Sequence, residues 1–171
     1  MGYLLDANVF IEAKNRHYGF DICPAFWDWL LHQNALGRVF SIARVGEELD
    51  EGADELAEWA NSRGPAFFLP PDVATLQPAL TAVSRWASRQ HYAPAAVHTF
   101  MQAADFYLVA HALAQKHVVV THEVPAPTGK QVKVPTACVG MSVKWMTPFE
   151  MLRVERARFV LGPGNPRPRS S

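Results

Sequence analysis

Four acidic residues stand beside apolar segments of the sequence: Asp6, Glu48, Asp105 and Glu123. Asp6 directly follows the apolar residues 3–5, which predict a short buried strand. An acid at the carboxyl end of such a strand lies where open α/β sheets bind ligands. An Asp at this position also commonly caps the next helix, and capping is the simpler interpretation of Asp6 taken alone.

Carboxylates gathered in one place have a specific chemistry. They cannot all stay charged without a proton or a cation, because their mutual repulsion raises some of their pKa values. Oxygen ligands without Cys or a paired-His spacing favour Mg²⁺ or Mn²⁺ over Zn²⁺. Such an ion can orient the in-line attack of a bound water on a phosphodiester. A cluster of the four acids would therefore support metal-dependent phosphodiester hydrolysis.

The rest of the sequence predicts the elements that must bring these acids together. Strands are expected at residues 3–5, 38–43, 66–69, 118–120 and 136–141. Helices are expected at residues 9–14, 24–36, 45–49 continuing over 56–60, 72–90, a short segment ending at 100, 102–116 and 148–154 after an N-cap at Thr147. Residues 15–19 and 125–135 are expected to be exposed or irregular loops. Alternating strands and helices predict a mainly parallel sheet covered on both faces, with successive strand ends on one edge.

In this order, the motifs Asp6-Ala7-Asn8, Glu48-Leu49, Ala104-Asp105 and Thr121-His122-Glu123 resemble the acidic signature of PIN-domain ribonucleases. That family includes the VapC-type toxins of toxin-antitoxin systems, and the resemblance covers most of the chain up to about residue 150. It implies a PIN-like three-layer α/β/α sandwich with a mainly parallel central sheet. It also implies a metal-dependent endoribonuclease that is the toxin of a toxin-antitoxin pair.

The resemblance implies a role for each motif residue. Asp6, Glu48, Asp105 and Glu123 would be the catalytic acids that hold Mg²⁺ or Mn²⁺, while Asn8, Ser41 and Thr121 would orient ligands or water. Glu48 is preferred to its neighbour Glu47, because adjacent helical residues point about 100° apart and Glu48 precedes a Leu as in the family pattern. The family more often has Asp at the final position. We expect the longer Glu123 to act through a bound water and the other three acids to form the principal cage.

RNA would be the substrate, and its phosphates need basic partners. The candidates are Lys14, Arg16 and His17 after the first motif and Lys130 and Lys133 after the last. A cognate antitoxin protein is implied by the resemblance, and a homodimer is a further partner considered. Trp29, Trp59 and Trp86 supply more large apolar groups than a small core has to bury.

Composition limits the classes of protein that remain. The 171 residues are 49% hydrophobic and 19% charged, which suits one domain over residues 1–160 followed by a flexible Pro- and Arg-rich tail at 161–171. Sixteen basic and sixteen acidic residues give no net field that would indicate nucleic acid or a membrane. No apolar run is long enough to span a bilayer, and Cys23 and Cys138 lack metal-type spacing. We therefore expect a cytoplasmic protein with reduced cysteines.

Two other functions fit parts of the sequence. A haloacid-dehalogenase-like phosphatase also begins with a strand ending in Asp and uses Mg²⁺, but it requires a second Asp where this chain has Asn8. A PIN-like module without catalysis, in which the acids are only caps and solvated faces, is the alternative outside enzymes.

Overall fold

The computed structural model describes residues 1–126, 130–160 and 162. Its strands are β1 (Tyr3–Leu5), β2 (Val39–Ile42), β3 (Phe68–Leu69), β4 (Val118–Val120) and β5 (Trp145–Met146). Helices in the first part are α1 (Ala7–Glu12), the π-helix η1 (Ala13–His17), α2 (Pro24–Ala35), α3 (Ala43–Asp50) and α4 (Glu55–Asn61). Those in the second part are α5 (Val73–Arg89), α6 (Pro94–Gln102), α7 (Ala104–Gln115), α8 (Val134–Gly140) and α9 (Pro148–Val154).

The five described strands form one sheet in the order β3-β2-β1-β4-β5. Every neighbouring pair is parallel, and β1 pairs with both β2 and β4. The prediction of a parallel α/β sandwich is therefore confirmed. Because β1 is the central strand, the residues that follow it and the residues that follow β4 lie side by side at the carboxyl edge of the sheet.

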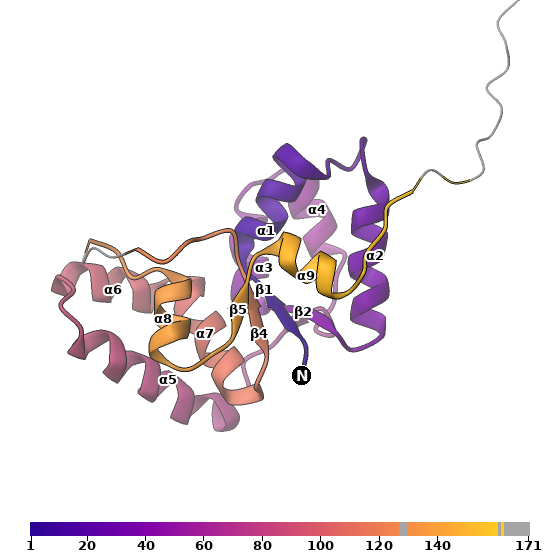
Figure 1. Ribbon diagram of the computed structural model, residues 1–171. Helices are drawn as coiled ribbons and strands as arrows, with labels where there is room; N and C mark the ends of the chain where they lie inside the picture. Colours follow the sequence, from indigo (N-terminus) through magenta and orange to yellow (C-terminus); the bar gives the residue numbers. More distant parts are fainter. Residues whose placement is uncertain (127–129, 161, 163–171) are drawn as a thin grey trace, which may run out of the picture.

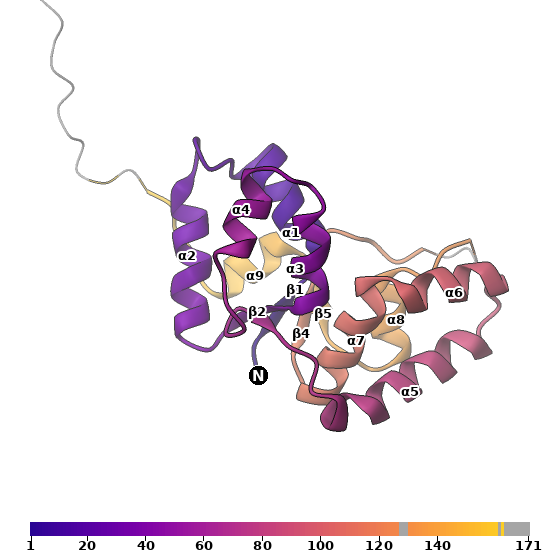
Figure 2. The ribbon, with the colours of Figure 1, turned by 180° about the vertical axis from the view of Figure 1, so that it is seen from behind.

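Helices cover the sheet on both sides. Figure 1 shows α1, α2, α4 and α9 on one side and α5, α6, α7 and α8 on the other, and Figure 2 shows the same division from behind. The strand β1 is buried between them, with Leu4 and Leu5 fully inaccessible to solvent. Burial on both faces explains why β1 and β4 are continuous apolar runs rather than alternating ones.

Two helices illustrate how the sequence produces these layers. In α5, the buried residues Leu76, Ala79, Val83 and Ala87 recur every three or four positions, which makes one apolar stripe that packs against α7. α9 begins with a capping box in which the Thr147 side chain accepts from the Glu150 backbone and Glu150 accepts from the Thr147 backbone. Both helices follow their predictions from sequence.

The predicted strand at residues 136–141 is wrong. This segment belongs to the helix α8, where Pro135 occupies the first turn and Ala137 and Cys138 are buried. A short apolar run does not distinguish a buried strand from a buried helix, and here burial beside α5 and α7 decides. The last strand is instead β5, at Trp145–Met146.

The loop expected at residues 15–19 also differs, because its first part lies in the π-helix η1. Asn15, Arg16 and His17 are nevertheless exposed, as predicted, whereas Gly19 is buried. The single helix expected over 45–60 is two helices, and Ala53 between them has a left-handed backbone with φ of 48°. The predicted tail at 161–171 lies outside the described residues except for Gly162. In the part of the chain that the structure describes, no helix is long and apolar enough to cross a bilayer.

Candidate active site

Asp6 is a buried carboxylate at the end of the central strand, with 4% of its surface exposed. Its backbone N–H donates to the Val120 carbonyl at 3.0 Å, which fixes it beside the end of β4. Asp6 occupies the N-cap position of α1, yet its Oδ2 accepts hydrogen bonds from the side chains of Asn8 at 2.6 Å and Thr121 at 2.7 Å. The interpretation of Asp6 as a simple helix cap therefore leaves out the partners of its carboxylate.

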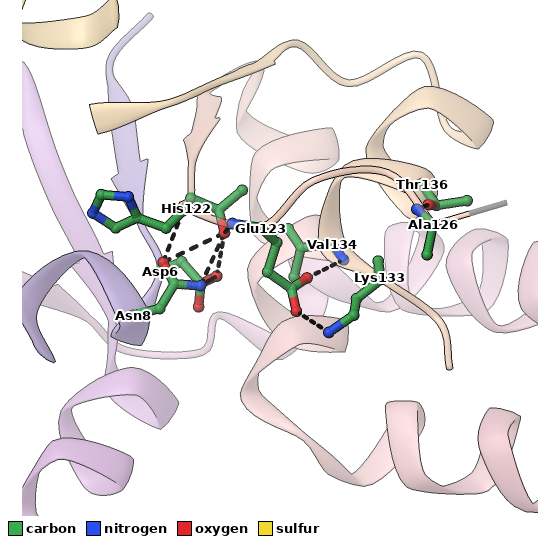
Figure 3. A network of polar contacts seen from close by, with 9 residues as sticks. Asp6, Asn8, His122, Glu123, Ala126, Lys133, Val134 and Thr136 are labelled. Atoms are coloured by element: carbon green, nitrogen blue, oxygen red, sulfur yellow. Dashed lines mark hydrogen bonds and ion pairs between the residues drawn. The ribbon is translucent and has the colours of Figure 1, made fainter. Parts of the chain in front are cut away.

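Asn8 connects the ends of β1 and β4. Its Nδ2 donates to Asp6 and, at 3.0 Å, to Thr121 Oγ1, while its Oδ1 accepts from the His122 backbone at 2.9 Å. Thr121 Oγ1 also accepts from the Glu123 backbone at 3.1 Å. These bonds, drawn in Figure 3, hold one Asp6 oxygen in a fixed direction.

Ser41 acts on the backbone instead of on an acid. Its buried hydroxyl donates to the Leu5 carbonyl at 2.6 Å and thereby ties the end of β2 to the residue before Asp6. The role implied by the resemblance, in which Ser41 orients ligands or water, stays a prediction.

Glu48 and Asp105 come from helices that start at the same edge. Glu48 lies in α3 directly after β2, and Asp105 lies in the first turn of α7. Partial desolvation raises the pKa of Glu48, and the charge of Asp105 raises it further. The neighbouring Glu47 approaches Arg44 at 3.8 Å, and both glutamates are exposed and line one cavity with Asp105.

The acids share one electrostatic environment. Burial raises the pKa of Asp6 to about 6, with further contributions from the charges of Glu123 and Glu48. Burial likewise raises the pKa of Asp105 to about 7, with contributions from Asp6 and Glu123. Ionised carboxylates are thus unfavourable here in the absence of a cation.

The Glu123 side chain points toward Lys133 and the start of α8. Its Oε1 accepts from Lys133 Nζ at 2.7 Å, and its Oε2 accepts from the Val134 backbone at 2.8 Å (Figure 3). Both oxygens are therefore engaged by the residues where α8 begins. This arrangement follows from the fold and has no signal in the sequence motif.

The donor set suits Mg²⁺ or Mn²⁺ in its chemistry, because Asp6, Glu48 and Asp105 offer only oxygen. All three of these carboxyls have raised pKa values, as expected for acids that require a compensating cation. Within residues 1–126, 130–160 and 162, however, no group of three or more His, Cys, Asp or Glu side chains is placed to hold a metal ion. The acids share one edge of the sheet without forming a ready-made cage.

The predicted RNA-binding residues fall into two groups. Lys14 pairs with Asp54 at 2.6 Å and Arg16 with Glu12 at 3.2 Å, so both have acidic partners of their own. Lys130 and Lys133 line a cavity of about 400 Å³. Asp105 and Glu123 line the same cavity, which joins the two lysines to the acids.

A second cavity, of about 450 Å³, continues from Asp105 in another direction. It is lined by Glu48 and by Arg44, whose guanidinium also lies 4.8 Å above the Tyr107 ring. Sequence reasoning did not single out Arg44. The sequence could have indicated Arg44 by its spacing, because a residue four positions before Glu48 lies on the same face of α3.

Three aromatic rings pack together next to the end of β4. His17 stacks on His122 with 5.6 Å between ring centroids, and the Phe149 ring meets both edgewise. In Figure 3 the His122 ring points away from Glu123. It forms part of a partly exposed aromatic group with His17 and Phe149.

Comparison with known protein families gives one match. Residues 3–159 match a family described as a domain of unknown function, DUF4411. The chain belongs to this family. No curated protein and no solved structure matches it. The match spans β1 through α9 and therefore includes every acid of the candidate site.

Proposed function

We propose that this protein is a metal-dependent endoribonuclease of the PIN-like type, with Asp6 and Asp105 at the centre of its site. The observation that carries the proposal is the pair formed by the buried Asp6 and the partly buried Asp105, whose pKa values desolvation and neighbouring acids raise to about 6 and about 7. Residues that serve only to stabilise the fold do not require two carboxyls with raised pKa values. A bound divalent cation would offset the repulsion between these carboxyls.

In this function, Asp6, Glu48 and Asp105 would hold Mg²⁺ or Mn²⁺. When bound, the ion would polarise a phosphate oxygen and lower the pKa of a bound water, which becomes the nucleophile. Asn8 and Thr121 keep the Asp6 carboxylate in one orientation through their bonds to Oδ2. Glu48 and Asp105 would have to move toward Asp6 on binding, because their side chains do not already form a cage.

The surroundings of the acids suit a single-stranded RNA. Lys130 and Lys133 offer positive charge for phosphates in the cavity beside Asp105. The rings of His17, His122 and Phe149 offer partly exposed faces on which an unpaired base could stack.

The decisive experiment is cleavage of an end-labelled, unstructured RNA with Mg²⁺, with Mn²⁺ and with EDTA. We expect internal cleavage with either metal and none with EDTA. Asp6→Asn and Asp105→Asn should abolish cleavage while the circular dichroism spectrum stays that of the wild type. Asp28→Asn is the matched control, because Asp28 is an exposed acid on α2.

Other outcomes would separate the alternatives. A DNA strand of the same sequence tests whether RNA is required. Release of phosphate from a phosphomonoester, without cleavage of RNA, would favour the phosphatase. That chemistry is disfavoured by Asn8, whose amide donates to Asp6 where a phosphatase of this kind needs a general acid. Absence of both activities and of Mn²⁺ binding would favour the inactive module.

The toxin role and the cytoplasmic location belong to the same proposal. Expression in a bacterial host should arrest growth, and the Asp6→Asn variant should not. Co-expression of a protein encoded beside this chain should restore growth if it is the antitoxin. The tryptophans considered for this partner, Trp29, Trp59 and Trp86, are half-buried against the core and do not form an evident docking surface. Normal growth with an active nuclease would remove the toxin role alone.

A further inference from the structure

Glu123 differs from Asp6, Glu48 and Asp105 because it forms an ion pair with a lysine, Lys133. Lys133 Nζ donates to Oε1 at 2.7 Å, and the Val134 backbone donates to Oε2 at 2.8 Å. The pair is only partly exposed, with 20% of the Glu123 side chain and 33% of the Lys133 side chain accessible. Each Glu123 oxygen accepts one hydrogen bond and keeps a second lone pair, but a metal ion that approaches either oxygen is repelled by the neighbouring Lys133 ammonium.

The charge of Lys133 also reaches the rest of the cluster. Lys133 lines the same cavity as Asp105, so its ammonium stands near that carboxyl as well as beside Glu123. The ammonium therefore offsets negative charge that would otherwise be left to a metal ion.

Lys133 also lines a cavity, so its ammonium can interact with groups other than Glu123. Lys133, Asp105 and Glu123 all line the cavity of about 400 Å³. In Figure 3 the side chains of Lys133 and Glu123 lie together on the side away from the His122 ring. An ammonium has three N–H donors, and the ion pair with Glu123 uses one of them. The others are available to an anionic group that enters beside Asp105.

We propose that Lys133 is a built-in second cation of the carboxylate cluster, which keeps Glu123 from binding metal and binds a substrate phosphate in the cavity beside Asp105. The inference rests on the proposed nuclease function. It assigns one metal ion to Asp6, Glu48 and Asp105 and gives Lys133 the electrostatic role that another metal would fill. Glu123 is then a positioning residue that holds the ammonium in place.

The test uses Lys133→Met, which keeps most of the side-chain length and removes the charge. Mn²⁺ binding to the full chain is measured by isothermal titration calorimetry, without RNA. Wild type should bind one ion, and Lys133→Met should bind Mn²⁺ about tenfold more tightly, because a repelling charge is lost and Glu123 is released. RNA cleavage should change in the opposite direction, with KM raised and kcat lowered at saturating Mn²⁺. Merely structural damage would weaken both.

Two further variants sharpen the result. Lys133→Arg retains the charge and should retain the wild-type affinity for Mn²⁺. Lys144→Met removes an exposed lysine near the opposite end of β4 and should change neither measurement.

The possible failures are distinguishable. If neither wild type nor Lys133→Met binds Mn²⁺, the proposed metal-dependent function fails and the inference fails with it. If wild type binds two ions, or if Lys133→Met leaves the Mn²⁺ affinity unchanged, the inference alone is overturned. Unchanged RNA kinetics in Lys133→Met would likewise overturn it, because the ammonium would then contact no substrate phosphate.

Discussion

Asn8 Nδ2 donates to Asp6 Oδ2 at 2.6 Å, and the same amide reaches Thr121 Oγ1 at 3.0 Å across the two central strands. The Asn8 amide carries no charge and so does not neutralise the Asp6 carboxylate. It does donate a hydrogen bond to that carboxylate, which a carboxyl group at position 8 could do only when protonated. The Asp6-Ala7-Asn8 motif thus connects the ends of β1 and β4 through hydrogen bonds.

Replacing Asn8 by Asp tests this relationship. Asn8→Asp puts a second carboxyl within hydrogen-bond distance of Asp6, so we expect the metal-free protein to lose on the order of 2 kcal/mol of unfolding free energy at pH 8. Urea denaturation measures the loss. Added Mn²⁺ should restore part of it, since a cation that binds only the folded state stabilises that state. Equal stability of variant and wild type at pH 8 would contradict the role given to the Asn8 amide.

Asp105 gives a prediction about pH. Its pKa of about 7 in the folded protein lies above the ordinary value of 3.8, so the folded state binds the proton more tightly than the unfolded chain. The contribution of Asp105 to stability is therefore complete below about pH 4 and is lost as the pH rises toward and past 7. Integrated over this range, the loss is at most about 4 kcal/mol.

Asp105→Asn removes this dependence. In metal-free urea melts, the variant should be more stable than wild type at pH 8, and the difference should shrink toward zero at pH 4. Comparing the two proteins cancels the titration of the histidines, which they share. A difference that stays constant between pH 4 and pH 8 would show that the Asp105 pKa is not raised.

Glu123 and Asp105 should differ in their importance for catalysis. Because Lys133 and Val134 already occupy both Glu123 oxygens, Glu123→Gln should lower kcat less than Asp105→Asn does at saturating Mn²⁺. A Gln side chain can still accept from one of these donors through its amide oxygen. Complete loss of cleavage in both variants would instead make Glu123 a direct ligand.

His111 supplies a prediction away from the site. It is 2% exposed in α7, and its Nδ1 has no hydrogen-bond partner among the described residues. Burial, together with the charge of His117, lowers its pKa to about 4, so the unfolded chain binds the proton more readily below the ordinary value of 6.5. This histidine therefore costs stability as the pH falls from about 6.5 toward 4.

His111→Leu should raise the unfolding free energy at both pH 5 and pH 8. The gain at pH 5 should exceed the gain at pH 8 by about 2 kcal/mol. The control is His98→Leu, because His98 is exposed on α6. A gain of equal size at both pH values would mean that the benefit of the substitution comes from apolar burial alone.

The sequence predicted the parts of this molecule that depend on local patterns. The apolar stripe of α5, the capping box at Thr147 and the acid at the end of β1 are readable because each involves residues a few positions apart. These features agree with the structure. The choice of Glu48 over Glu47 used both the angle between successive helical residues and the family pattern, and it stays a prediction.

What could not be predicted depends on contacts between distant segments. The helix α8 was mistaken for a strand because its apolar residues suit either element, and only packing against α5 and α7 decides. The Lys133–Glu123 pair, ten residues apart, exists because α8 begins beside the end of β4. The stack of His17 on His122 likewise requires η1 and β4 to be neighbours in space.

The central place of β1 has a consequence for how the protein is made. Asp6 and its buried partner Thr121 are 115 residues apart in the sequence, so Asp6 is translated long before Thr121. Until β4 has been translated, β1 can pair only with β2. The surroundings of the Asp6 carboxylate are therefore completed only after β4 has joined the sheet.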